Sequence, residues 1–158
     1  MKKKTSATTE TVDKGRAMID FTGKIIHVGI DVHLKLYQIC LLFDGLILGN
    51  YSIEADAQIL IDFLKNRFPG ATLKCVYESC AWGFNLQRQL ASAGIECIVV
   101  HAGDIPGSDK EKKNKTDKVD AKRLARHHAA GLLRAIYVPD EQLEKHRSLV
   151  TLPQKFIR

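Results

Sequence analysis

The sequence predicts an α/β fold built on one mixed sheet of five strands, and two observations support this. Three segments rich in β-branched and apolar residues follow one another with short turns between them, which indicates an antiparallel meander. Helical and strand patterns then alternate, which indicates right-handed crossovers and parallel pairing. The length of 158 residues fits one domain with or without a tail.

The first three strands are predicted over residues 24–30, 36–43 and 46–53. Residues 24–30 are β-branched and apolar, which is typical of a central strand buried on both faces. The pair Asp44-Gly45 separates the second and third segments and is a strong signal for a two-residue hairpin turn.

The remaining elements follow in order. Residues 54–68 repeat apolar side chains at helical spacing until Pro69-Gly70 ends the pattern. Two further strands are predicted over residues 72–77 and 95–100, with a helix over 82–93 between them. Residues 101–114 predict a loop. A third helix is expected to begin near Thr116, its N-cap, and to run to about Ala130, and residues 140–158 predict the start of another helix, interrupted by Pro153.

The chain is basic, with a formal net charge of +6, and the charge is concentrated at its flanks. Residues 1–24 carry six basic and three acidic side chains, whereas residues 25–100 carry five and seven. This asymmetry is typical of proteins that meet nucleic acid. Residues 1–23 are polar and unpatterned, and they predict a disordered basic N-terminal tail.

The location is predicted to be the cytoplasm. No apolar run reaches the length of a membrane span, and no apolar segment follows the N-terminal lysines as a signal peptide requires. The cysteines lack the spacing of a zinc site and are expected to be reduced. They are Cys40, Cys75, Cys80 and Cys97.

Four carboxylates stand at the ends of predicted elements. Asp31 ends the first strand, Glu78 ends the fourth, and Asp117 and Asp120 lie three apart in the opening of the third helix, so they share one of its faces. Carboxyl ends of parallel strands meet at one edge of a sheet. Oxygen-only ligands of this kind suit Mg²⁺ or Mn²⁺, which can activate water on a phosphodiester. The pattern predicts a metal site at this edge.

Basic side chains near these acids are predicted to contact nucleic-acid phosphates. They are Lys35, Lys112, Lys113, Lys115, Lys118, Lys122, Arg123 and Arg126.

Three motifs resemble the N-terminal domain of the DEDD transposases, the bacterial insertion-sequence recombinases. They are Gly29-Ile30-Asp31-Val32-His33, Tyr77-Glu78-Ser79-Cys80 and Lys115-Thr116-Asp117-Lys118-Val119-Asp120-Ala121. The last is the most specific, and the resemblance covers about residues 24–150. It implies a ribonuclease-H-like (RuvC-like) fold with helices on both faces of the sheet, and it assigns Asp31, Glu78, Asp117 and Asp120 as the metal-binding catalytic acids.

The same resemblance implies further properties. It divides the chain into a RuvC-like catalytic domain at 24–134 and the start of a helical region at 135–158. It implies DNA as substrate, a structured guide RNA as partner, and a homo-oligomer at full length. Family members carry a nucleophilic serine in a separate C-terminal domain. The sequence stops at Arg158, so we expect a truncated fragment that does not complete recombination alone.

Three alternative functions use the same residues differently. A stand-alone junction resolvase or ribonuclease would use the same four acids. A sugar-kinase-like or actin-like ATPase would need a small phosphate-binding loop after Asp31, where this chain has the bulky segment 32–35. A noncatalytic interaction module would keep the acids as remnants.

Overall fold

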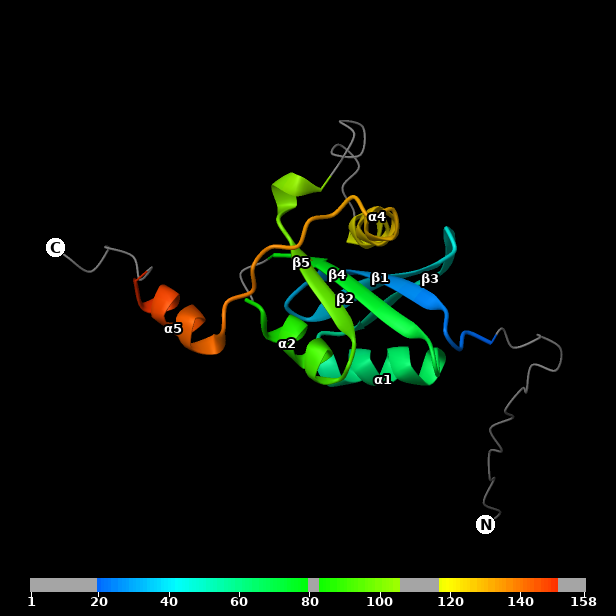
Figure 1. The fold of residues 1–158 in the computed structure, drawn as a ribbon, viewed down its shortest axis with the longest axis horizontal. Helices are drawn as coiled ribbons and strands as arrows, with labels where there is room; N and C mark the ends of the chain where they lie inside the picture. The colour runs from blue at the N-terminus through cyan, green and yellow to red at the C-terminus, as the bar shows by residue number, and fades with distance from the viewer. Residues whose placement is uncertain (1–19, 80–82, 106–116, 151–158) are drawn as a thin grey trace, which may run out of the picture.

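The computed structural model describes residues 20–79, 83–105 and 117–150. Its strands form one sheet in the order β3-β2-β1-β4-β5 (Figure 1). The strands are β1 (Ile25–Val32), β2 (Leu36–Phe43), β3 (Leu46–Glu54), β4 (Thr72–Glu78) and β5 (Glu96–Val100). The pairs β1-β2 and β2-β3 are antiparallel, whereas β1-β4 and β4-β5 are parallel. The predicted mixed sheet and its opening meander are confirmed.

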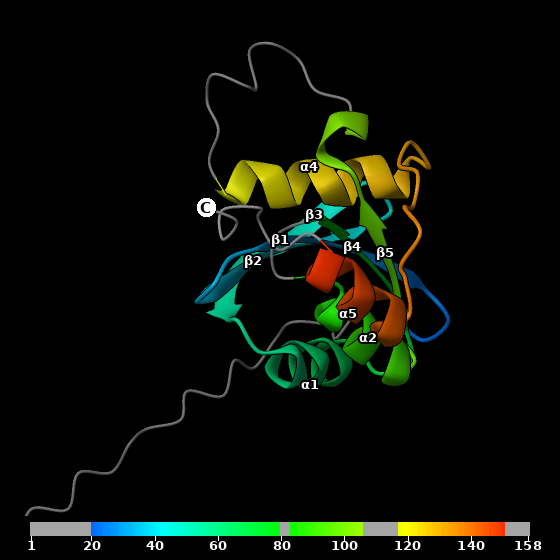
Figure 2. The same cartoon turned by 90° about the vertical axis from the view of Figure 1, so that its left-hand side faces the viewer.

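Helices cover both faces of the sheet, as predicted. Helices α1 (Ala57–Arg67) and α2 (Asn85–Ser92) lie on one face, and α4 (Asp117–Ala129) lies on the other (Figures 1 and 2). A short 3-10 helix, η1 (Ala102–Asp104), follows β5, and α5 (Glu141–Val150) follows an extended segment.

Two helix starts differ from the sequence prediction. Strand β3 continues to Glu54, and α1 begins after Asp56, whose carboxylate accepts a hydrogen bond from the Ile59 N–H at 2.9 Å. This N-cap, rather than the apolar spacing, fixes the start of the helix. Helix α2 begins at Asn85, and the predicted start at Trp82 lies outside the described residues, as does the predicted N-cap Thr116.

The hairpin between β2 and β3 confirms the turn predicted from Asp44-Gly45. Both residues have positive φ, 47° and 77°. A type I′ turn requires positive φ at its two central residues, and its twist matches that of the flanking strands. The Asp-Gly pair therefore sets the register of the meander.

The main core lies between the sheet and the α1–α2 layer. Leu60 and Leu64 of α1 and Leu90 of α2 are fully buried there, against alternate residues of β1 such as Val28 and Ile30. The face under α4 holds two smaller clusters. One joins α4 to β2, and the other joins it to β4, β5 and the η1 segment.

Segments at both ends of the domain pack against it. Residues 20–23, predicted as part of the tail, are in contact with the core: the Phe21 ring meets those of Phe43 and Phe68 edge-on. After α4 the chain crosses β5, where the Ile136 N–H donates to the Val99 carbonyl at 2.8 Å. Across the described ranges, no helix has the length and apolar character needed to span a membrane.

Candidate functional site

Asp31 and Glu78 lie side by side at the carboxyl edge of the sheet. Parallel pairing of β1 with β4 matches Ile30 with Tyr77, and the two acids are the next residue on each strand. Ile30 and Tyr77 point into the main core under α1 and α2. Successive side chains of a strand alternate between faces, so both carboxylates point to the α4 face.

Helix α4 runs antiparallel to β1 across this face. Its C-terminal His128 contacts His27 of β1, with ring centroids 5.1 Å apart. Further along β1, Gly29 meets the backbone of Ala121 and Ala125, and a Cβ there would lie 2.6 Å from the Ala125 nitrogen. Since α4 and β1 advance in opposite directions, the first turn of α4 lies level with the end of β1.

The first turn of α4 carries the remaining acids. Leu124 packs in a cluster with Val76 of β4. Asp120 precedes Leu124 by one helical turn, so it lies on the same side of the helix, toward the end of β4 that carries Glu78. Asp117 is the first residue of α4, and its side chain lies outside the described part. The fold thus brings Asp31, Glu78 and Asp120 to one face of one edge.

Two of these carboxylates already have basic partners. Oδ2 of Asp31 lies 3.0 Å from Nε2 of His33, and Oδ1 of Asp120 lies 3.2 Å from the Arg123 guanidinium one turn later. Within the described ranges, no three His, Cys, Asp or Glu side chains come close enough together to hold a metal ion. The donors fit a hard divalent cation in kind, since all are carboxylate oxygens. Closure around an ion requires these side chains to move.

The predicted phosphate-binding residues fall into three groups. Lys35, in the β1–β2 turn, and Arg126 are exposed. Lys122 is half-buried on the β2 side of α4, where the charges of Lys122 and Arg126 partly offset the rise in the pKa of the Cys40 thiol. Arg123 is turned to Asp120, with its side chain only 19% exposed. The last group lies outside the described side chains: Lys112, Lys113, Lys115 and Lys118.

At the far end of α4, His128 contacts His27 of β1, and the pKa of both rings is lowered. Burial, together with the neighbouring His27, lowers the pKa of His128 to about 4. Burial also lowers the pKa of His27, as does Lys74. Neither ring's Nδ1 has a hydrogen-bond partner. His128 is therefore a packing residue at neutral pH and stands at the opposite end of α4 from the acids.

Three of the four cysteines lie buried among the described residues. Cys40, Cys75 and Cys97 are free, and burial raises the pKa of all three thiols, that of Cys97 to about 12. They are apolar core residues rather than ligands or nucleophiles.

Gly29 is the residue whose importance the sequence interpretation missed. Its lack of a Cβ allows the backbone of α4 to lie directly on β1, opposite Ala121 and Ala125. The available signal was a glycine inside an otherwise apolar strand, which marks close approach of another backbone. The alanine after Asp120 belongs to the same contact.

Comparisons with known proteins agree with this geometry. A sequence model of the DEDD transposase family of IS110, described as a transposase, matches residues 28–158. The transposase for insertion sequence element IS1533 of Leptospira borgpetersenii is 36% identical over 104 residues, which are 64% of this chain and 30% of that protein. The transposase-like protein y4qE of Sinorhizobium fredii is 43% identical over 76 residues, 47% of this chain and 19% of that one.

A solved structure shares the fold. The RuvC structure of Thermus thermophilus aligns with a TM-score of 0.51 over 70% of this chain and 99% of that chain, at 11% sequence identity. The likeness confirms the predicted RuvC-like fold. The chain spans under a third of the length of the two transposase relatives.

Proposed function

The chain belongs to the DEDD transposase family of IS110, and we propose that it is the catalytic domain that performs metal-dependent cleavage and transfer of DNA strands. One observation carries this proposal. Helix α4 docks antiparallel on β1, so its opening turn, which holds Asp117 and Asp120, lies over the strand ends that hold Asp31 and Glu78.

These four carboxylates would hold Mg²⁺ or Mn²⁺. Bound there, such an ion would activate the attacking oxygen and stabilise the leaving oxygen of a phosphodiester. Asp31 and Glu78 are fixed by adjacent strands of the sheet, whereas Asp120 is carried by a helix held through small residues. His33 contacts Asp31 and Arg123 pairs with Asp120, and both contacts must open for the site to close.

The partners follow from the same site. DNA phosphates would contact Lys35 beside the acidic edge, and Lys122 and Arg126 further along α4. Lys112, Lys113, Lys115 and Lys118 would add contacts, and their side chains lie outside the described part. The full-length protein would work in the bacterial cytoplasm as a homo-oligomer, with a structured guide RNA and a serine nucleophile supplied by a further domain.

Calorimetric titration of the chain with Mn²⁺ tests the proposal. We expect saturable binding that is lost in the double variant Asp31→Asn, Asp120→Asn, because each change removes one charged oxygen donor. The matched control is Asp62→Asn, an exposed acid on α1 across the sheet, which should bind as the wild type does. Equal affinity in the double variant would reject the metal site.

A stand-alone junction resolvase is the alternative, and the RuvC-like fold is the observation that favours it. Incubation of the chain with four-way junctions and RNA–DNA hybrids in Mn²⁺ separates the two functions. Structure-selective cutting by this chain alone would favour the resolvase, and inactivity would favour a transposase domain that depends on the rest of its protein.

A further inference from the structure

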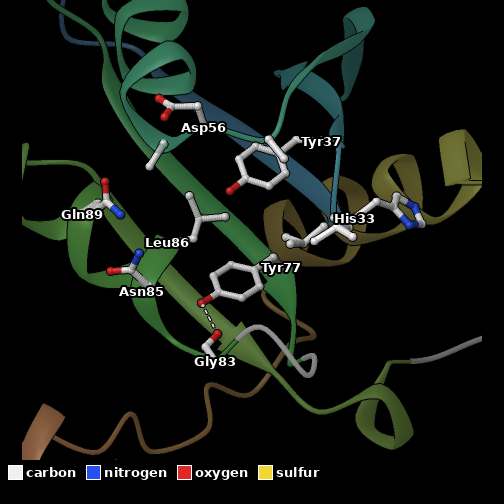
Figure 3. Close-up of a pocket in the computed structure, with 12 residues that line it drawn as sticks. His33, Tyr37, Asp56, Tyr77, Gly83, Asn85, Leu86 and Gln89 are labelled. Atoms are coloured by element: carbon white, nitrogen blue, oxygen red, sulfur yellow. Dashed lines mark hydrogen bonds between the residues drawn. The ribbon is translucent and has the colours of Figure 1, made fainter.

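A cavity of about 290 Å³ lies at the same carboxyl edge of the sheet, but on the α1 and α2 side (Figure 3). Its inner wall is apolar and is formed by Val32, Leu86 and the rings of Tyr37 and Tyr77. The volume stands at the small end of the range for ligand pockets. It suits one flat ring system better than a peptide segment.

The outer wall of the cavity is polar. Asn85 and Gln89 lie one turn apart on α2, so both amides face the same side, and Asp56 at the start of α1 also lines the cavity (Figure 3). The two amide side chains make no hydrogen bond with another described residue. Oδ1 of Asp56 caps α1, and a carboxylate keeps further acceptor capacity beyond one bond.

The charge of the lining limits what could bind. Among the described residues that line the cavity, none is a lysine or arginine, and the carboxylate of Asp56 is its one acidic group. A phosphate or another anion would meet repulsion there. Amides and a carboxylate above an apolar wall instead complement a neutral ring with donors and acceptors at its edge, which describes a nucleobase.

The segment 31–33 connects the cavity to the acidic edge. Asp31 points to the α4 face, whereas Val32 lines the cavity on the opposite face. His33 contributes to the lining, but its ring is turned away from the cavity, and its Nε2 lies 3.0 Å from the Asp31 carboxylate (Figure 3). A nucleotide whose phosphate lies at the acids would therefore have its base within reach of the cavity.

We propose that this cavity receives one unpaired nucleobase of the strand held at the acidic edge. The proposal rests on the function proposed above, because it requires a nucleic-acid strand at Asp31. The base must be unpaired, since a base within a duplex has its hydrogen-bonding edge occupied and is stacked on both sides. DNA and RNA offer the same chemistry, so either strand could supply the base.

Fluorescence anisotropy with short single strands tests the cavity. The probes are a labelled oligodeoxynucleotide of mixed sequence, its RNA counterpart, and the same DNA backbone carrying abasic residues. The variant is Asn85→Ala with Gln89→Ala, which removes the unpartnered amides from exposed positions of α2. The control is Gln58→Ala, which removes an exposed amide of α1 outside this cavity.

We expect the wild type and the control to bind a base-bearing strand about tenfold more tightly than the abasic strand, because only the former fills the cavity. The double variant should bind both strands at the abasic level. The DNA and RNA arms identify which strand supplies the base. Equal binding of intact and abasic strands by the wild type would overturn the proposal, as would an unchanged base preference in the double variant or no binding of any strand.

A Mn²⁺ titration of the same samples separates this proposal from the function on which it rests. A double variant that loses base preference while binding Mn²⁺ as the wild type does supports both. Absent base preference with intact Mn²⁺ binding overturns the cavity alone. Absent Mn²⁺ binding in the wild type overturns the metal site, whatever the base preference.

Discussion

The two faces of the sheet are built in different ways. Under α1 and α2, large side chains such as Leu60, Leu64 and Phe68 fill one continuous core. Under α4, the contact is made by small residues, with Ala121 and Ala125 set against Gly29. The first face holds most of the buried apolar side chains of the described residues. The second holds the backbone of α4 directly on β1.

If the proposed site is correct, this difference separates stability from chemistry within one sheet. Changes on the α1–α2 face should act mainly on unfolding, whereas changes on the α4 face should act on metal and nucleic-acid binding with smaller effects on unfolding. The base cavity is the exception, because it opens on the stable face beside the acidic edge.

The largest loss of stability should come from Leu64→Ala in α1. Leu64 is fully buried, and removing its side chain leaves a cavity in the main core. We expect the free energy of unfolding in urea to fall by about 2–5 kcal/mol. The matched change Ile59→Ala on the same helix, where the side chain is 41% exposed, should cost much less. Equal losses would show that α1 does not anchor the core as described.

Gly29→Ala should show most clearly that the α4 face controls metal binding. A methyl group there meets the backbone of Ala121 and Ala125, which cannot move without shifting α4. We expect a loss of about 1–3 kcal/mol in stability together with weakened Mn²⁺ binding, measured by urea unfolding and calorimetry. Gly103→Ala, which meets only the side chain of His101, is the control. Wild-type Mn²⁺ affinity in Gly29→Ala would contradict the close docking of α4.

Acid should loosen the far end of α4. Burial holds the folded-state pKa of His128 at about 4, below the value of 6.5 expected when unfolded. The unfolded chain therefore binds the proton first. This contribution to stability is complete above pH 6.5 and is lost as pH falls toward 4.

Because the ring is only half-buried, we expect a loss of about 1–2 kcal/mol between pH 7 and pH 4.5. His128→Gln should flatten this dependence in urea unfolding measured across pH, while the exposed His146→Gln on α5 should leave it unchanged. Glu96 favours the protonated form of His128 and Lys74 opposes it, and these two side chains form an ion pair with each other. If His128→Gln left the pH dependence of the free energy of unfolding unchanged, another group would be responsible for the acid sensitivity.

The smallest effect on stability should come from two basic side chains of α4. Lys122→Ala and Arg126→Ala should each change the free energy of unfolding by about 0.5 kcal/mol or less. Each should lower the slope of DNA affinity against salt by about one, since each removes one phosphate contact. An unchanged slope in both variants would place the DNA path away from this side of α4.

The sequence predicted the sheet better than the helix starts. Alternating apolar segments and the Asp44-Gly45 turn are local signals, and both were confirmed. The beginning of α1 depended instead on the Asp56 cap and on how far β3 pairs with β2, which periodicity alone does not reveal.

The candidate site was partly predictable for a similar reason. Ends of parallel strands meet at one edge of a sheet, so the neighbouring positions of Asp31 and Glu78 followed from topology. The direction of α4 did not, because it depends on the contact of Gly29 with Ala121 and Ala125. His33 contacts Asp31, and Arg123 contacts Asp120. The spacing in the sequence allows both contacts, but it does not show that these side-chain conformations are adopted.

We propose above that acids from β1, β4 and α4 surround one divalent ion. Paramagnetic line broadening by Mn²⁺ in an NMR titration of the labelled chain tests it residue by residue. We predict that backbone amides of Asp31, Glu78 and Asp120 broaden together at the lowest Mn²⁺ concentration, while those of His27 and His128 at the other end of α4 stay sharp. Broadening at one of the three acids alone, or at the histidines first, would contradict the account.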